Sequence, residues 1–152
     1  MIEKINIKFK RLNEKHSDIP LPQYHTEESA GMDIRAAIDE FMIIKSGEIA
    51  LIPTNLAVEI PKGYELQVRP RSGLALKHGI IIPNSPATID SDYRGELKII
   101  IMNLGKEDFK IERGDRIAQL VISKIYHASI IEVDELSTTS RGEGGFSSTG
   151  IK

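Results

Sequence analysis

The chain has 152 residues, 40% of them hydrophobic, which is enough for one hydrophobic core and does not require a second domain. A net charge of −2 argues against a protein that grips a nucleic-acid backbone, because such proteins gather Lys and Arg to neutralise phosphates. With no cysteine, disulfides, thiolate catalysis and Cys-based zinc sites are excluded. The N-terminus lacks a signal-peptide pattern and no apolar run approaches the roughly 18 residues of a membrane span. We therefore expect a soluble, cytoplasmic protein without nucleic-acid or membrane partners.

Short apolar segments recur along the chain. Ile5, Ile7 and Phe9 alternate with polar residues, which predicts a half-buried strand. Further strands are predicted, between Pro, Gly or Asn residues, at 49–52, 57–60, 64–68, 79–82, 97–102 and 117–125. The pattern is typical of an all-β sandwich or jelly roll. Because only 5% of the residues are aromatic and none is Trp, we expect an aliphatic core.

Residues 72–79 form the one segment that predicts a helix, two turns long. Ser72 could cap its start, and Gly79 could end it. Arg71 and Ser72 place a guanidinium and a hydroxyl where the free N–H groups of a helix start favour an anion. Two interpretations remain open, a phosphate-binding corner and an ordinary turn.

A long polar connection, residues 83–96, lies between two predicted strands. Asp90 and Asp92 are two positions apart, so both face one way in an extended chain. One carboxylate could orient a water molecule while the other anchors the loop. Alternatively, both make turn hydrogen bonds to their own backbone, the commoner role of Asp in a loop.

Two polar residues stand in apolar surroundings. Asp33 follows Gly31 in a short apolar stretch, where a carboxylate needs a partner. It could bind a metal or a metal-bound water, or it could pair with a nearby arginine. Gln119 stands in an otherwise apolar run, so its amide either hydrogen-bonds within the core or points into a site.

The C-terminal residues 140–150 combine four glycines with an arginine, a phenylalanine and several hydroxyls. Backbone N–H groups, hydroxyls and a guanidinium suit phosphate oxygens, and an aromatic ring can stack on a base. We predict that residues 137–152 form a flexible, glycine-rich lid for a nucleotide, following a single β domain over residues 1–136. The alternative is a disordered chain end.

In this order, the five segments from Ala30 to Gly150 resemble the five motifs of the homotrimeric dUTPase family, the dUTP diphosphatases. The resemblance implies a jelly-roll-like β-clip fold and a homotrimer with active sites at its subunit boundaries. It also implies hydrolysis of dUTP to dUMP and pyrophosphate with Mg²⁺. That reaction would limit uracil incorporation into DNA and supply dUMP for thymidylate synthesis.

The resemblance implies a role for each matching residue. Asp90 would activate the attacking water, and the ring of Tyr93 would pack against the deoxyribose and leave no room for a 2′-hydroxyl. Asn84 and the hairpin backbone at Ile89 would bind the uracil edge. Asp33 would contact, through water, a magnesium ion held chiefly by the triphosphate.

The remaining implied contacts are to the phosphates and the face of the base. The residues at the helix start would bind the phosphate chain, and the amide in the last apolar run would bind an α-phosphate oxygen or the attacking water. The tail would add the γ-phosphate and base-stacking contacts. These residues are Arg71, Ser72, Gly73, Gln119, Arg141, Phe146, Ser148 and Thr149.

Two positions depart from the family pattern, since Ala87 and Ser147 stand where glycine is most frequent. Ala87 concerns the shape of the hairpin and Ser147 the closing of the lid. Two rival functions are considered. A dCTP deaminase would share the fold but would need a glutamate over the cytosine amine, and a non-catalytic trimer would use the same surface for a regulatory protein.

Overall fold

The computed structural model describes residues 3–145. The regular secondary structure of this part of the chain is almost entirely strand, with one short α-helix and one 3-10 helix. Its elements are β1 (Lys8–Arg11), the 3-10 helix η1 (Glu14–His16), β2 (Gln23–Tyr24), β3 (Gly31–Arg35), β4 (Phe41–Ile44), β5 (Ile49–Glu59), β6 (Tyr64–Arg69), α1 (Ser72–His78), β7 (Ile80–Ile81), β8 (Ala87–Ile89), β9 (Glu96–Asn103), β10 (Phe109–Glu112) and β11 (Arg116–Lys124).

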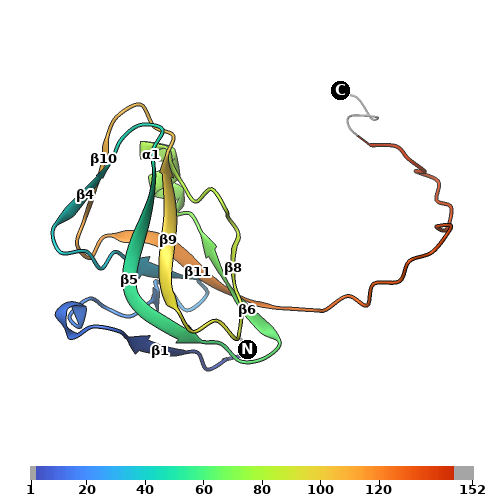
Figure 1. Cartoon of the computed structure of the whole chain (residues 1–152), viewed down its shortest axis with the longest axis horizontal. Coiled ribbons are helices and arrows are strands. Elements are labelled where there is room, and N and C mark those ends of the chain that lie inside the picture. Colours follow the sequence, from blue (N-terminus) through green and yellow to red (C-terminus); the bar gives the residue numbers. More distant parts are fainter. Residues whose placement is uncertain (1–2, 146–152) are drawn as a thin grey trace.

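The strands form two main antiparallel sheets that enclose the core. One has the order β1-β5-β9-β7 and the other β2-β3-β11-β6-β8, while β4 and β10 make a separate pair. Figure 1 shows β5 and β9 side by side in front of β11 and β6, with α1 at one end of the sheets. The predicted all-β sandwich is confirmed.

Aliphatic side chains from both sheets meet in the core. Along β9 buried residues alternate with more exposed ones, the period-2 pattern of a strand with one face in the core. Ile52 and Ile99 from one sheet and Leu66 and Leu120 from the other are at most 1% exposed. Each such side chain contributes roughly 1.5–3 kcal/mol on burial. The core cluster consists of Ile, Leu, Val, Ala and Met, so the expected aliphatic core is confirmed.

The strand β5 differs from the sequence-based prediction. Two strands separated by a break at residues 53–55 were expected, but β5 continues through them and Pro53 pairs with Lys98 of β9. The register shifts between Pro53 and Ala57, and Asn55 has φ of 60°, which together mark a bulge. The Asn55 side chain donates from Nδ2 to the carbonyl of Asn13 at 2.8 Å. The predicted break is therefore wrong: Pro and Asn here bend one long strand.

Other boundaries also differ. The first strand begins at Lys8, so both Ile5 and Ile7 lie before it. Five short strands (β2, β3, β4, β8 and β10) were not predicted. The strand β8 lies inside the segment interpreted as a polar connection, where it pairs with β6. Ala87, at the start of β8, is buried opposite Val68, so the hairpin accommodates its side chain.

The helix α1 occupies the predicted place. Gly79 ends it at φ of 68°, and its N–H donates to the carbonyls of Ala75 and Leu74, as expected for a glycine C-cap. The start differs from the prediction. Arg71 occupies the N-cap position with an extended backbone, no side chain caps the helix, and Ser72 is its first residue.

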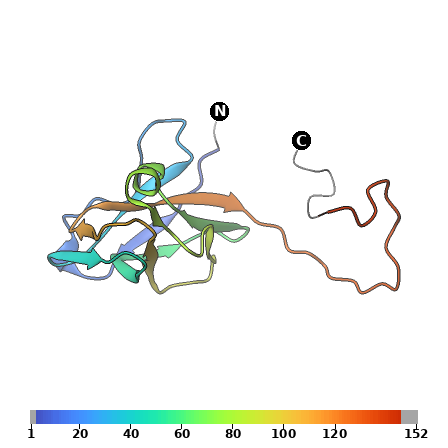
Figure 2. The same cartoon turned by 90° about the horizontal axis from the view of Figure 1, so that it is seen from above.

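Beyond β11 the chain leaves the sheets. Ile125 is held by its N–H, which donates to the carbonyl of Gly63 at 2.9 Å. Residues 126–145 contain no helix or strand and run away from the β domain (Figures 1 and 2). The division at residue 136 into a β domain and a lid stays a prediction. No helix in the described part of the chain is long and apolar enough to span a membrane.

Candidate active site

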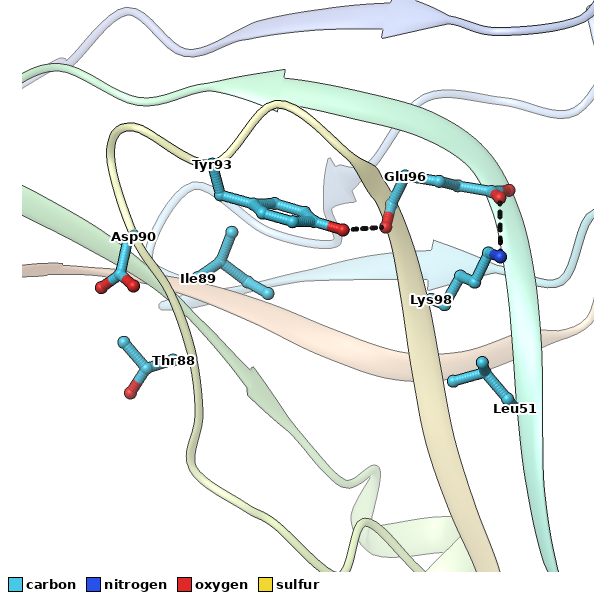
Figure 3. Close-up of a pocket in the computed structure, with 7 residues that line it drawn as sticks. All are labelled: Leu51, Thr88, Ile89, Asp90, Tyr93, Glu96 and Lys98. Carbon is cyan, nitrogen blue, oxygen red and sulfur yellow. Dashed lines mark hydrogen bonds and ion pairs between the residues drawn. The ribbon is translucent and has the colours of Figure 1, made fainter.

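A cavity of about 430 Å³ opens between the β8–β9 turn and the strands β5 and β9 (Figure 3). It contains two of the predicted site residues on the turn, Asp90 and Tyr93, and a third, Ile89, on β8. The full lining is Leu51, Thr88, Ile89, Asp90, Tyr93, Glu96 and Lys98.

Asp90 is the first residue after β8, and its backbone closes the turn. The carbonyl of Asp90 accepts a hydrogen bond from the N–H of Tyr93 at 3.1 Å. Arg94 supports the turn by donating from Nη1 to the carbonyls of Ser91 (2.7 Å) and Tyr93 (2.9 Å). Within residues 3–145 neither Asp90 nor Asp92 uses its carboxylate in a turn hydrogen bond. The exposed Asp90 carboxylate at the cavity is therefore available to bind water.

Tyr93 forms one wall of the cavity. Its ring lies near Ile89, and its hydroxyl points to β9, where it donates to the carbonyl of Glu96 at 3.0 Å (Figure 3). Asn84 is exposed in the turn after β7, which is closed by the N–H of Ser85 donating to Ile82, and it does not line this cavity.

A second cluster surrounds Asp33 on β3. Its Oδ1 accepts from Nε of Arg71 and its Oδ2 from Nη1 of Arg116, both at 3.1 Å. Arg71 also donates from Nη1 to the carbonyl of Arg116 at 3.1 Å. Of the interpretations open for Asp33, the ion pair with arginine is present, and it holds the Arg71 side chain in place directly before α1.

Gln119 belongs to this second cluster. In β11 it lies opposite Asp33 of β3 on one side and Arg69 of β6 on the other. Gly31 makes room for it, since a Cβ atom at Gly31 would approach the Gln119 Cβ to 3.3 Å. Ser72 and Gly73 follow Arg71 as the first residues of α1. The fold thus places Arg71 and Gln119 beside Asp33, with Ser72 and Gly73 directly after Arg71 in the chain.

The two clusters lie at opposite ends of β6. Ile89 pairs with Leu66, so Asp90 comes next to the start of β6, whereas Gln119 pairs with Arg69 at its end. Four residues of strand, at about 3.3 Å each, separate the two positions by roughly 13 Å. One chain therefore does not bring Asp90 and Gln119 to the same phosphate.

The part of the tail that the structure describes, residues 137–145, lies apart from the β domain (Figure 2). Arg141 is exposed, and its Nε donates to the carbonyl of Gly144 at 2.7 Å. Phe146, Ser148 and Thr149, like the unusual Ser147, lie outside the described residues.

Several lining residues were not identified from the sequence. Glu96 and Lys98 lie two apart on β9, with the charged groups at 3.7 Å from Nζ to Oε2. The sequence pattern that could have identified them is a pair of charged residues on either side of the buried Leu97, because alternate positions of a strand lie on one face. Arg116 gave no sequence signal, because only the pairing of β3 with β11 places it beside Asp33.

No group of three or more acidic or histidine side chains suited to a metal exists among the residues that the structure describes. Both Asp33 oxygens accept from arginines, and a carboxylate oxygen retains a lone pair that can accept from a water. This donor set does not suit a metal held by protein ligands alone, but it fits one whose ligands come mainly from a phosphate chain.

Comparison with known proteins identifies the family. The dUTPase family model matches residues 17–150. The chain is 63% identical over 131 residues to a deoxyuridine 5′-triphosphate nucleotidohydrolase of Treponema denticola, covering 86% of this chain and 91% of the relative. It is 54% identical over 147 residues to the enzyme of that name from a Thermoanaerobacter species, covering 97% and 99%.

Solved structures agree with this similarity. The dUTPase of Staphylococcus bacteriophage 80alpha, solved with dUPNHPP, is 30% identical with a TM-score of 0.85, over 96% of this chain and 99% of that one. A mutant dUTPase from phage phi11 of S. aureus, described as coordinating a structural Mg(II) ion, is 28% identical with a TM-score of 0.74, over 86% and 97%. The family model and these relatives show that the chain belongs to the dUTPase family.

Proposed function

We propose that Asp90 is the general base of this enzyme, which is a dUTP diphosphatase. The protein hydrolyses dUTP to dUMP and pyrophosphate, a reaction that limits uracil incorporation into DNA and supplies dUMP for thymidylate synthesis. The observation that carries the proposal is the exposed Asp90 carboxylate beside Tyr93 in a cavity large enough for a nucleoside. Neither a dCTP deaminase nor a non-catalytic trimer is favoured by the family and its relatives.

In the proposed reaction, Asp90 accepts a proton from a water as the water oxygen attacks the α-phosphorus. The bond from that phosphorus to the bridging oxygen breaks, and pyrophosphate leaves. No covalent enzyme intermediate is needed, because phosphoryl transfer depends mainly on positioning and on charge stabilisation.

The nucleoside would be recognised around the same cavity. Tyr93 would pack against the deoxyribose, and its position would exclude a 2′-hydroxyl. Asn84 and the backbone at Ile89 would bind the polar edge of uracil. A site built to hydrogen-bond such an edge can reject a base lacking the matching groups by about 10⁴-fold.

The phosphates would be bound by the second cluster. Arg71, Ser72, Gly73 and Gln119 supply a guanidinium, a hydroxyl, backbone N–H groups and an amide, which suit phosphate oxygens. Because Asp90 lies roughly 13 Å along β6 from Gln119, we propose that one subunit supplies the first cluster and another subunit the second. A closed threefold ring would then contain three such shared sites.

Mg²⁺ is proposed as the cofactor, bound chiefly by the triphosphate, with Asp33 contacting it through water. When bound, a magnesium ion neutralises charge that develops on the phosphate oxygens. Asp33 would also hold Arg71 towards the phosphates through the 3.1 Å ion pair that the two side chains make.

The tail is proposed to complete the site as a lid over residues 137–152. Arg141 would contact the γ-phosphate, Phe146 would stack on the uracil, and Ser148 and Thr149 would add phosphate contacts. Stacking of one base on an aromatic ring stabilises a complex by about 1–3 kcal/mol.

The decisive variant is Asp90→Asn. It retains the shape of the side chain but removes the proton acceptor, so kcat should fall by about 10² or more while dUTP binding is largely kept. Pyrophosphate release would be measured with dUTP, dCTP, dTTP and UTP, and a strong preference for dUTP is expected. Asp92→Asn, in the same turn, is the matched control and should retain most activity. An Asp90→Asn enzyme of near-normal rate would exclude Asp90 as the base.

A further inference from the structure

Gly95 and Glu96, which follow Tyr93 closely in the chain, determine where its ring lies. The Tyr93 hydroxyl donates to the carbonyl of Glu96 at 3.0 Å, so the far end of the ring is tied to the first residue of β9. Figure 3 shows the ring reaching across the cavity between Asp90 and Glu96. Tyr93 as a residue is 44% exposed, so little packing on the cavity side restrains its ring.

Gly95 leaves the space that the hydroxyl end of the ring occupies. A Cβ atom on Gly95 would overlap the Tyr93 hydroxyl and lie 2.5 Å from Cζ and 3.0 Å from Cε2. The three nearest atoms all belong to Tyr93. Gly95 is not among the glycines with positive φ, so alanine fits its backbone. The ring is thus the part of the molecule that an added methyl group would displace first.

Glu96 is itself anchored to the bulge of β5. Its Oε1 accepts from the backbone N–H of Asn55 at 2.9 Å, and its Oε2 lies 3.7 Å from Nζ of Lys98. Asn55 is buried at the bulge, where it has positive φ. The position of the Tyr93 hydroxyl is therefore tied, through Glu96, to the bulge of β5, an interior strand of its sheet.

We propose that Gly95 and Glu96 are positioning residues that fix the Tyr93 ring and thereby set the discrimination between dUTP and UTP. The inference rests on the proposed role of Tyr93 against the deoxyribose. A close contact between ring and sugar rewards a deoxyribose and rejects a 2′-hydroxyl only while the ring stays in one place. Displacing the ring should therefore lower kcat/KM for dUTP more than for UTP, because UTP does not make the close contact in the first place.

The test is the ratio of kcat/KM for dUTP to that for UTP in Gly95→Ala. We expect the ratio to fall about tenfold, the scale on which one methyl group alters discrimination in a packed site. In a Tyr93→Ala background, Gly95→Ala should change the ratio little, because the atoms that it meets are gone. A fall of equal size in both backgrounds, or an unchanged ratio in the single variant, would overturn the proposal.

Glu96 provides a matched pair of variants. Glu96→Gln keeps an oxygen that can accept from Asn55, whereas Glu96→Ala does not, so Glu96→Ala should lower the ratio more, roughly fivefold for one lost hydrogen bond. Equal ratios in the two variants would contradict the role of this anchor. If Gly95→Ala does not fold, Tyr93→Phe carries the test: it removes the bond to Glu96, and an unchanged ratio would overturn the proposal.

The outcomes separate this inference from the proposed function. Suppose that the wild-type enzyme releases pyrophosphate from dUTP, that Asp90→Asn is inactive and that Gly95→Ala has the wild-type ratio. These results would contradict the positioning role alone. A wild-type enzyme that does not prefer dUTP to UTP would remove the proposed role of Tyr93 as well.

Discussion

The Asp33 carboxylate shows how a single residue acquires its role from its neighbours. Its side chain is only 16% exposed, and a charge that is mostly removed from water needs partners. It has two, Arg71 and Arg116, from segments 38 and 83 residues away in the chain. The result is a guanidinium held directly before α1, where we propose that it meets a phosphate.

Two surface carboxylates, Asp18 and Asp39, make the stability of the fold depend on pH. The hydrogen bond from Arg113 lowers the pKa of Asp18, and that from Lys15 lowers the pKa of Asp39, relative to the ordinary 3.8. A carboxyl with a lowered pKa in the folded state stabilises it above pH 3.8, and this contribution is lost as the pH falls through the folded pKa. Both pairs are exposed, so each effect is small.

We therefore expect Arg113→Ala to lower Tm slightly at neutral pH and not at all in acid. The measurement is thermal unfolding of both proteins between about pH 7 and pH 2.5 at fixed protein concentration. The difference in Tm should stay constant down to about pH 5 and shrink as the pH falls below 3.8 and through the lowered pKa of Asp18. A difference that persists in strong acid would show that Arg113 acts through packing.

At the scale of elements, β5 is a long strand bent by its bulge. The N–H and side chain of Asn55 leave the ladder to bind Glu96 and Asn13, and the buried Thr54 hydroxyl donates to the carbonyl of Leu97 at 2.6 Å. The bulge thereby joins β5 to the N-terminal segment and to the cavity wall.

Asn55 tests this bulge, since its φ of 60° favours Asn or Gly. Asn55→Gly can adopt the same left-handed backbone conformation but loses the hydrogen bond to Asn13, at a cost of about 1 kcal/mol. Asn55→Ala loses the same bond and adds left-handed strain of about 1–2 kcal/mol, so it should be the less stable variant. Urea unfolding at one protein concentration measures both. Equal stability of the two variants would contradict strain at this position.

At the scale of the whole molecule, the separation of the two clusters along β6 is the reason to propose a second subunit in each site. We predict that refolding a mixture of Asp90→Asn and Gln119→Ala subunits restores activity that neither variant has. If each site takes one cluster from each of two neighbouring subunits, random assembly leaves about a quarter of the sites intact. Each variant refolded alone is the control. A mixture that stays inactive, or light scattering that shows an active monomer, would contradict shared sites.

The tail belongs to the same scale, because residues 126–145 run away from the β domain of their own chain. Deleting residues 141–152 should leave assembly intact and lower kcat/KM for dUTP strongly. Phe146→Ala should lose a smaller amount, about 1–3 kcal/mol of transition-state stabilisation for one stacked base. Ser147→Gly serves as the control and should not reduce activity. Full activity in the truncated enzyme would mean that the segment is an ordinary chain end.

Much of the fold was accessible from local patterns. Short aliphatic runs between Pro, Gly or Asn residues identified the strands β6, β9 and β11 within a residue or two, and Gly79 marked the helix end. Short strands such as β8 and β10 escaped, because three or four residues carry little periodic signal. Pro53 was interpreted as a break for the same reason: a local rule cannot see the partner strand that keeps it in register.

For the candidate site too, part of the information was in the sequence and part only in the tertiary structure. The sequence alone determined the class of fold, an aliphatic core and the order of the five motifs, because periodicity and residue chemistry are properties of short stretches of chain. Only the tertiary structure decided that Arg116 pairs with Asp33, that Gly95 makes room for Tyr93, and that β6 separates Asp90 from Gln119. These relations join residues through strand pairing and side-chain packing, and the register of distant strands is set by burial of the whole core.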